Sequence, residues 1–256
     1  GKVVLEVQAL EVENDRGLLA VKDISLNVHQ NEIVGIAGVA GNGQRELVEA
    51  ITGLRKVKRG RVIILGQDMT NHPVSEIVDK GVAHIPEERI RVGTVPNMTI
   101  AENLVLKDYR RPGFSKGFFL NLPFINAAAD KLISEYNVMA PTRETPARLL
   151  SGGNIQRMIL ARETSGNPKL IVAAHPTYGL DVVATEQIRQ QLLRQRSNGA
   201  AILLVSEDLE EILSLSDRIA VMFEGRIMGI VEGAEADIDE LSLMMAGVAL
   251  KKESSA

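Results

Sequence analysis

The sequence predicts an α/β domain with a mostly parallel sheet. Residues 169–176 and 200–207 are short apolar runs bounded by turn signals, which is typical of strands buried on both faces of a parallel sheet. Residues 183–199, between these runs, have a helical pattern that ends at an Asn-Gly pair. Strand, helix and strand therefore alternate, which is the arrangement of an α/β domain.

The first part of the chain is predicted to contain several strands. Residues 3–14 and 21–38 alternate apolar and polar residues or run apolar in short stretches. A helix is expected to begin at about Arg45, after a glycine-rich turn. Two further strands and then two helices are predicted at residues 60–69, 81–86, 125–138 and 155–164.

The segment from about Glu87 to Leu149 differs in composition from the rest of the chain. The simpler interpretation of its many aromatic residues is that a small helical lobe uses them for a compact core. The alternative is an exposed patch for docking. The aromatic residues of this segment are Tyr109, Phe114, Phe118, Phe119, Phe124 and Tyr136.

The composition is that of an ordinary globular chain, with 256 residues, 45% hydrophobic content and a net charge of -4. The 29 basic and 33 acidic residues give no overall attraction for nucleic acid, so no nucleic-acid partner is expected. The absence of cysteine excludes disulfides, thiol catalysis and thiolate metal sites. No apolar run reaches about 18 residues, so the chain is not expected to span a membrane by itself.

The stretch from Gly38 to Leu54 is close to a phosphate-binding loop followed by a helix. Gly38 and Gly43 have the spacing of such a loop, but Gln44 and Arg45 follow where Lys and then Ser or Thr are usual. Taken alone, this stretch is equally compatible with a simple turn.

Two further motifs follow in order. Residues 150–157, LSGGNIQR, place a serine and two glycines at the start of a helix, where free N–H groups and the helix dipole suit an anion, although a plain N-cap has the same appearance. Residues 170–181, LIVAAHPTYGLD, form a buried strand that ends in Pro, Thr, Gly and Asp.

Together these motifs resemble the nucleotide-binding domain of ABC transporters, and the resemblance covers nearly the whole chain. It implies a P-loop ATPase fold over residues 1–247, with an N-terminal antiparallel β subdomain, a helical subdomain at about 87–149 and a tail at 248–256. The phrases AGVAGNGQREL, IPEER, PTYGLDVVAT and LVSEDLEEI are most similar to the C-terminal half of the tandem ATPases of bacterial simple-sugar and ribonucleoside importers.

The resemblance also implies a set of site residues. The phosphate loop comprises Gly38, Gly41, Asn42, Gly43, Gln44 and Arg45, the Q-loop position is Glu87, the signature is Leu150, Ser151, Gly152, Gly153 and Asn154, the Walker B and base positions are Ala174 and His175, the D-loop residue is Asp181 and the switch position is Glu207.

Six of these positions carry a different residue from the one that acts in a competent member of the family. The resemblance therefore implies weak ATP binding and impaired hydrolysis in this chain, with no metal site of its own and Mg²⁺ held mainly in a partner's site. No aromatic residue precedes Tyr109, so the usual adenine-stacking side chain is also missing. The replacements are Gln44 for Lys, Arg45 for a hydroxyl residue, Glu87 for Gln, Ala174 for Asp, His175 for Glu and Glu207 for His.

The resemblance implies that such domains work as facing pairs, in which each ATP lies between the phosphate loop of one domain and the signature of the other. A half with a degenerate phosphate loop can therefore remain essential for hydrolysis in the pair. We expect Ser151 to Asn154 to complete an ATP site whose other groups come from a second, competent nucleotide-binding domain, the N-terminal half of the same polypeptide. The expected partners for transport are integral membrane permease subunits and, indirectly, a substrate-binding protein. This domain would be peripheral at the cytoplasmic face of the inner membrane. A soluble ABC-type ATPase of translation or DNA repair, or a scaffold that no longer binds ATP, are the alternatives.

Two side-chain pairs are expected at the replaced positions. Arg45 and Glu87 would pair in the space of the missing metal. His175 and Glu207 look like the family's Glu and His exchanged, and they would lie within hydrogen-bond reach of each other.

Overall fold

The computed structural model describes residues 1–117 and 119–248, so Phe118 and nearly all of the expected tail at 248–256 lie outside the described residues. The chain divides into two compact units. The first unit comprises residues 1–84, 169–175 and 192–256, and the second comprises residues 85–168 and 176–191. The expected helical subdomain, at about 87–149, falls within the second unit.

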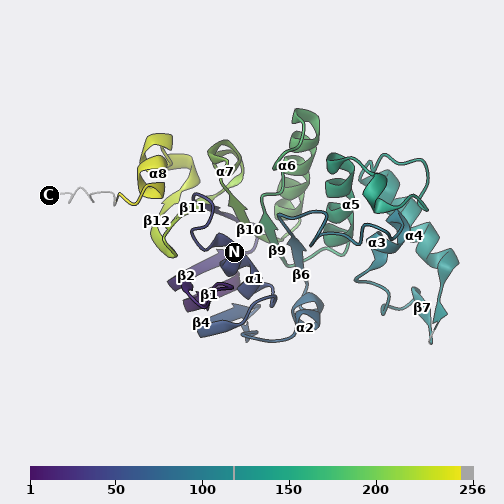
Figure 1. Cartoon of the computed structure of the whole chain (residues 1–256), viewed down its shortest axis with the longest axis horizontal. Helices are drawn as coiled ribbons and strands as arrows, with labels where there is room; N and C mark the ends of the chain where they lie inside the picture. Colours follow the sequence, from purple (N-terminus) through teal and green to yellow (C-terminus); the bar gives the residue numbers. More distant parts are fainter. Residues whose placement is uncertain (118, 249–256) are drawn as a thin grey trace. The chain divides into compact units, whose positions relative to one another are not determined.

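A six-stranded sheet, in the order β12-β11-β3-β10-β9-β6, forms the centre of the first unit (Figure 1). Strand β3 is parallel to β10 and β11, β10 is parallel to β9, and β11 and β12 form an antiparallel pair. The predicted mostly parallel core is therefore confirmed. The strands are β3 (Ile33–Ala37), β6 (Val82–Ile85), β9 (Leu170–Ala174), β10 (Ala201–Ser206), β11 (Arg218–Phe223) and β12 (Arg226–Glu232).

A second, four-stranded sheet in the order β2-β1-β4-β5 is antiparallel, as the family resemblance implied. Its β4–β5 pair corrects one prediction, because residues 60–69 are not one strand. Leu65 and Gly66 have φ values of 51° and 76°, which turn the chain back on itself as a two-residue hairpin loop. The strands are β1 (Val3–Glu13), β2 (Leu19–His29), β4 (Val57–Ile64) and β5 (Gln67–Asp68).

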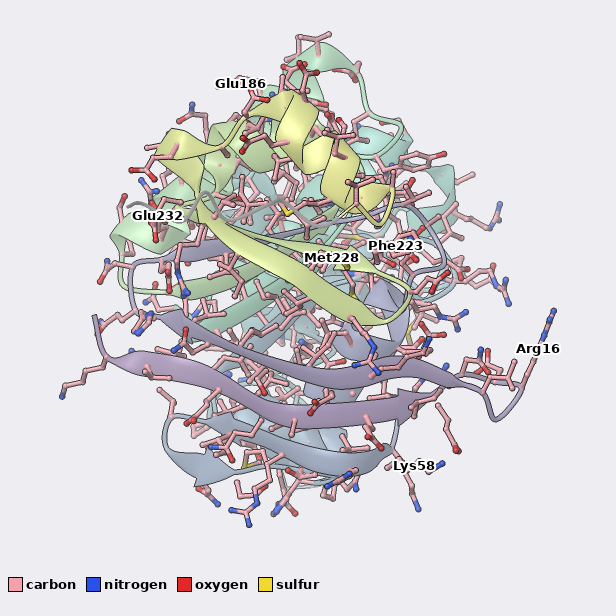
Figure 2. The ribbon with its side chains drawn as sticks, turned by 90° about the vertical axis from the view of Figure 1, so that its left-hand side faces the viewer. Arg16, Lys58, Glu186, Phe223, Met228 and Glu232 are labelled. Carbon is pink, nitrogen blue, oxygen red and sulfur yellow. The ribbon has the colours of Figure 1, made fainter. Side chains whose placement is uncertain are left out.

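Helix α1 (Gln44–Ile51) contacts β1, β2 and β9, and it joins the two sheets into one buried apolar cluster. Its Leu47 and Ile51 are fully buried there. Figure 2 shows the β11–β12 hairpin, with Phe223 and Met228, beside the strands of the antiparallel sheet. The remaining helices of this unit are α2 (Val74–Asp79), α7 (Leu209–Leu215), the 3-10 helix η2 (Gly233–Glu235) and α8 (Ile238–Met245).

The second unit is mainly helical. Helix α3 contacts α4 and α5, and Thr99 and Glu102 form a reciprocal capping box at the start of α3. Buried Glu163 pairs with Lys107 and with Arg162 and so ties the helix ends together. The elements are α3 (Ile100–Val105), β7 (Ser115–Lys116), β8 (Phe119–Leu120), α4 (Leu122–Glu135), η1 (Ala147–Leu149), α5 (Gly152–Thr164) and the first part of α6 (Val182–Ser197).

The aromatic residues of this unit depart from the compact-core interpretation. Tyr136 is buried and its hydroxyl lies 2.8 Å from that of Thr164. Phe124 packs edge-on against Phe114 but is half exposed, and Phe119 is 80% exposed. Of the aromatic side chains that the structure describes in this segment, Tyr109, Phe119 and Phe124 are exposed, which fits the exposed-patch alternative better than a compact core.

Within the described residues, no helix combines the length and the apolar character that crossing a membrane requires.

Candidate functional site

The glycine-rich loop connects β3 to α1 in a conformation that requires glycine. Gly41 and Gly43 have φ values of 83° and 99°, and Gly43 is the N-cap of α1. A Cβ atom on Gly43 would lie 2.3 Å from the carbonyl oxygen of Ala20. The loop thus keeps the close backbone turn on which phosphate loops depend.

The backbone of this loop retains donors for an anion. Leu47 N–H donates to the carbonyl oxygen of Gly43, which begins the helical hydrogen bonding. In the part of the chain that the structure describes, the N–H groups of Gln44, Arg45 and Glu46 have no acceptor. Free N–H groups at the positive end of a helix favour anions.

The side chains of the loop, in contrast, are bound within the loop itself. Buried Gln44 donates from Nε2 to the carbonyl oxygen of Val39 at 2.9 Å, and Asn42 donates to the same oxygen at 3.0 Å. Asn42 also accepts from the N–H of Glu224 at 2.7 Å. Gln44 therefore brings a neutral amide, already hydrogen-bonded, to the position where a lysine would present a charge.

Arg45 is held on its own helix. Its Nε donates to Glu49 at 2.8 Å, and Glu49 also accepts from Arg55 at 2.7 Å. The Glu49 carboxylate raises the pKa of Arg45. The expected partner, Glu87, belongs to the second unit, and its pairing with Arg45 stays a prediction.

The strand ends carry the other replaced positions. Ala174 is the buried last residue of β9, and His175 follows it with a φ of 46° and donates its N–H to Val205 at 2.8 Å. Glu207 is exposed directly after β10. Among residues 1–117 and 119–248, no hydrogen bond or ion pair joins the His175 and Glu207 side chains, so that expected pairing is wrong.

These positions do not fit a magnesium ion. Mg²⁺ takes oxygen ligands, whereas the side chains of Arg45 and Ala174 supply none at the two positions where the resemblance implies a hydroxyl and a carboxylate. The described residues contain no group of three or more His, Cys, Asp or Glu side chains able to hold a metal.

The signature residues 151–153, unlike the loop side chains, keep polar groups that remain accessible. Ser151 caps α5 by accepting from the N–H of Asn154 at 3.4 Å and from its side chain at 3.1 Å. Ser151 and Gly152 are exposed, and the N–H groups of Gly152 and Gly153 donate to no other described residue. An accessible hydroxyl and two free N–H groups therefore meet at the positive end of a long helix.

The D-loop residue packs beside the signature. Asp181 caps α6 by accepting from the N–H of Ala184 at 2.8 Å. A Cβ atom on Gly153 would lie 3.4 Å from the Cβ of Ala184 and 4.0 Å from Asp181 Oδ2. Tyr178, Val182 and Val183, which flank Asp181 in the sequence, are strongly exposed, so this edge offers apolar surface for contact with another protein.

Sequence reasoning missed Arg89. Its guanidinium reaches the signature, because a Cβ atom on Gly152 would lie 3.2 Å from Arg89 Nη1. Arg89 is the last residue of the motif IPEER, which contributes to the family resemblance. Nothing in the sequence predicts that its side chain lies close to Gly152.

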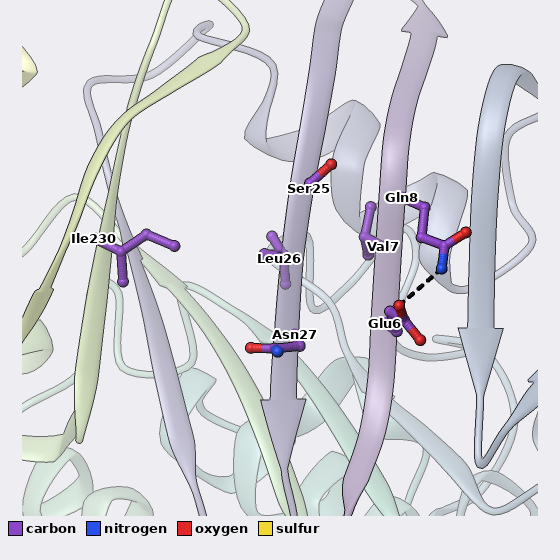
Figure 3. Close-up of a pocket in the computed structure, with 7 residues that line it drawn as sticks. All are labelled: Glu6, Val7, Gln8, Ser25, Leu26, Asn27 and Ile230. Atoms are coloured by element: carbon purple, nitrogen blue, oxygen red, sulfur yellow. Dashed lines mark hydrogen bonds between the residues drawn. The ribbon is translucent and has the colours of Figure 1, made fainter.

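A pocket of about 310 Å³ lies apart from these residues, between β1 and β2 on one side and Ile230 of β12 on the other (Figure 3). Its polar groups are already engaged, because Gln8 donates to Glu6 at 2.7 Å and the side-chain oxygen of Asn27 accepts from Arg218 at 3.1 Å. None of the predicted site residues lines it.

Comparison with curated proteins finds importer subunits. The chain is 45% identical over its whole length to the guanosine import ATP-binding protein NupO of Bacillus subtilis, of which it covers 50%. It is 46% identical over 96% of its length to the nucleoside import ATP-binding protein NupA of Lactococcus lactis, of which it covers 48%. The chain thus spans about half the length of the curated relatives it matches.

A solved structure described as the ATP binding subunit of an ABC transporter has the same fold, with a TM-score of 0.77 and 21% identity over 95% of this chain and 99% of the other. The family model for the ABC transporter matches residues 21–178, which is more than half of the sequence. The β3-loop-α1 turn, the LSGGN signature and these matches agree, and the chain belongs to the ABC transporter family.

Proposed function

We propose that this chain is the degenerate half of an ATP-binding subunit of a nucleoside importer, and that it completes the ATP site of a second, competent half. The names of the relatives NupO and NupA support nucleosides as the solute, with simple sugars as the other class. Coverage of about half of each relative supports a second half in the same polypeptide.

One contrast carries the proposal. The replaced loop residues Gln44 and Arg45 are engaged in the loop and with Glu49, whereas the hydroxyl and N–H groups of Ser151, Gly152 and Gly153 are accessible. A domain that hydrolyses its own ATP would need the loop side chains to be free for the nucleotide. A domain that completes a partner's ATP site needs the signature groups to be accessible.

Hydrolysis in this half is expected to be negligible. Phosphoryl transfer depends on positioning and on cations that stabilise charge in the transition state. Three groups that this chemistry requires are absent at their expected positions. Gln44 supplies no loop cation, Ala174 supplies no metal ligand, and His175 supplies no basic carboxylate. The loop N–H groups still permit weak ATP binding, with little help from Mg²⁺.

The signature acts on ATP held by the other half. When the halves close, Ser151 donates a hydrogen bond from its hydroxyl to the γ-phosphate, and the N–H groups of Gly152 and Gly153 do the same. The dipole of α5 adds positive potential at the same point. The exposed apolar residues Tyr178 and Val182 support a protein partner against this edge.

Docking on the permease would use the second unit. Its exposed apolar side chains, among them Phe119, Leu120 and Leu122, support a protein contact there. The domain would then be peripheral at the cytoplasmic face of the inner membrane, and the substrate-binding protein would act on it only through the permease.

Guanosine uptake by the complete transporter tests this function. We predict that Gly152→Asp abolishes uptake, because it adds a side chain and a negative charge where the γ-phosphate must approach. Ser165→Ala, at the exposed far end of α5, is the matched control and should transport normally.

Normal uptake in the Gly152→Asp transporter would contradict the proposal. Absence of permease subunits when the native complex is purified would favour the soluble ATPase or the scaffold instead. A transporter that takes up ribose but not guanosine would show that the solute is a simple sugar and not a nucleoside.

A further inference from the structure

Arg89 lies in the loop after β6, in the same unit as the signature. Its N–H donates to the carbonyl oxygen of Glu87 at 3.1 Å, and Val92 and Gly93 both donate to Glu88, so the loop is internally held. The half-buried guanidinium rests over Gly152, where an added Cβ atom would be only 3.2 Å from Nη1. Gly152 thus leaves space for this cation.

The guanidinium has no counter-charge in the part of the chain that the structure describes. No carboxylate or other acceptor binds it, and neighbouring Glu88 lies 3.5 Å from Arg91 instead. Burial lowers the pKa of Arg89 below its ordinary value, and no other residue that the structure describes offsets that shift. An arginine nevertheless stays protonated in proteins, so a full positive charge is held here.

This placement is electrostatically unfavourable for the domain alone. A cation beside the N-terminal end of a helix meets the positive end of the helix dipole. Partial desolvation without a partner adds a further cost. Because the N–H groups of Gly152 and Gly153 are also free, three sources of positive potential converge on one exposed point.

We propose that Arg89 contacts the γ-phosphate of the ATP held by the partner half and stabilises its charge during hydrolysis. This inference rests on the proposed function, because it adds a residue to the signature's contact. The anion relieves the unfavourable charge described above, so the contact forms as the two halves close.

The chemical step needs no proton from this residue. A water oxygen bonds to the γ-phosphorus while the bond to the bridging oxygen breaks, and the electron pair leaves with ADP. The proton of the water passes to the base of the competent half. Arg89 remains protonated throughout and stabilises charge on the phosphoryl oxygens, as cations do in phosphoryl transfer generally.

The test uses the complete transporter with Arg89→Ala and Arg89→Lys, and measures kcat and KM for ATP. We expect Arg89→Ala to lower kcat about 100-fold or more, the range for lost transition-state donors, with little change in KM. Arg89→Lys should retain part of the rate, and added guanidinium ion should partly restore Arg89→Ala. Arg91→Ala, which removes an exposed arginine two residues away, is the control and should be unchanged.

Signature variants separate the two proposals. If Gly152→Asp stops hydrolysis while Arg89→Ala has the normal kcat, the role of Arg89 is overturned and the proposed function stands. If Gly152→Asp leaves hydrolysis intact, the proposed function fails and the inference with it. If Arg89→Ala is inactive but neither lysine nor guanidinium ion restores any rate, Arg89 is structural and the inference is overturned.

Discussion

At the scale of single residues, the glycine-rich loop keeps its backbone turn while its polar side chains form hydrogen bonds within the protein. Gly43 keeps its left-handed conformation and its close approach to Ala20, so the turn survives. Buried Gln44 donates from its side-chain amide to the carbonyl oxygen of Val39, so this amide is engaged within the protein.

Restoring the loop lysine should not restore catalysis. We predict that Gln44→Lys in the isolated chain tightens ATP binding about tenfold to a hundredfold, since a hydrogen bond to a charged group contributes about 1.5–3 kcal/mol. It should not hydrolyse ATP, because Arg45 and Ala174 still provide no metal ligand. Calorimetry with and without Mg²⁺ measures the binding, and the uncharged Gln44→Met is the control. Mg²⁺-dependent turnover at about 1 per second in Gln44→Lys would contradict this account.

At the scale of elements, Glu32 links the two sheets of the first unit. It accepts from Arg218 Nε of β11 at 2.6 Å and from the N–H of His29, at the end of β2, also at 2.6 Å. Burial raises the pKa of Glu32, but the hydrogen bonds from Arg218 and His29 outweigh burial, so its pKa lies below the ordinary value. The folded state therefore prefers the ionised carboxylate.

This lowered pKa predicts a pH dependence of stability. A depressed pKa stabilises the fold above the unfolded-state value of about 4.5, and that stabilisation is lost as pH falls through the lower folded-state pKa. Glu32→Gln should therefore cost about 1.5–3 kcal/mol of unfolding free energy at pH 7 and progressively less below about pH 4.5. Urea unfolding measures both, with exposed Glu235→Gln as the control. A cost that grows as pH falls would contradict the assignment.

The elements also show what sequence could and could not predict. The strands β3, β9 and β10 were predictable because they are continuously apolar and bounded by turns. The sequence predicts one strand over residues 60–69 because nothing in it signals the positive φ of Leu65, which is unusual for a leucine.

The candidate site was also predictable only in part, because local motifs are visible in the sequence and side-chain contacts are not. Ser151 to Asn154 form a local motif, so the sequence could predict the capped helix start that the structure shows there. The approach of Arg89 to Gly152 and the capture of Arg45 by Glu49 depend on side-chain conformation in the folded chain. The expected His175–Glu207 contact was wrong because proximity of two strand ends does not direct their side chains toward each other.

At the scale of the whole molecule, we propose that two halves of an importer subunit have different tasks. This chain belongs to the ABC transporter family and matches half of each nucleoside-import relative. On the proposed function, Gln44, Arg45 and Ala174 leave its own nucleotide position without a loop cation or metal ligands. Its signature edge is exposed and flanked by exposed apolar residues. Its essential contribution is therefore expected to be a surface and not a reaction.

The most direct test compares Gly152→Asp with Gln44→Ala in the complete transporter by measuring the ATPase rate. Gly152→Asp should abolish hydrolysis by the other half, although the altered domain has no catalytic groups of its own. Gln44→Ala should retain most of the rate, because on the proposed function it alters the site that does not hydrolyse ATP. A transporter that hydrolyses ATP normally with Gly152→Asp but is inactive with Gln44→Ala would show that the division of labour is the reverse of the one proposed.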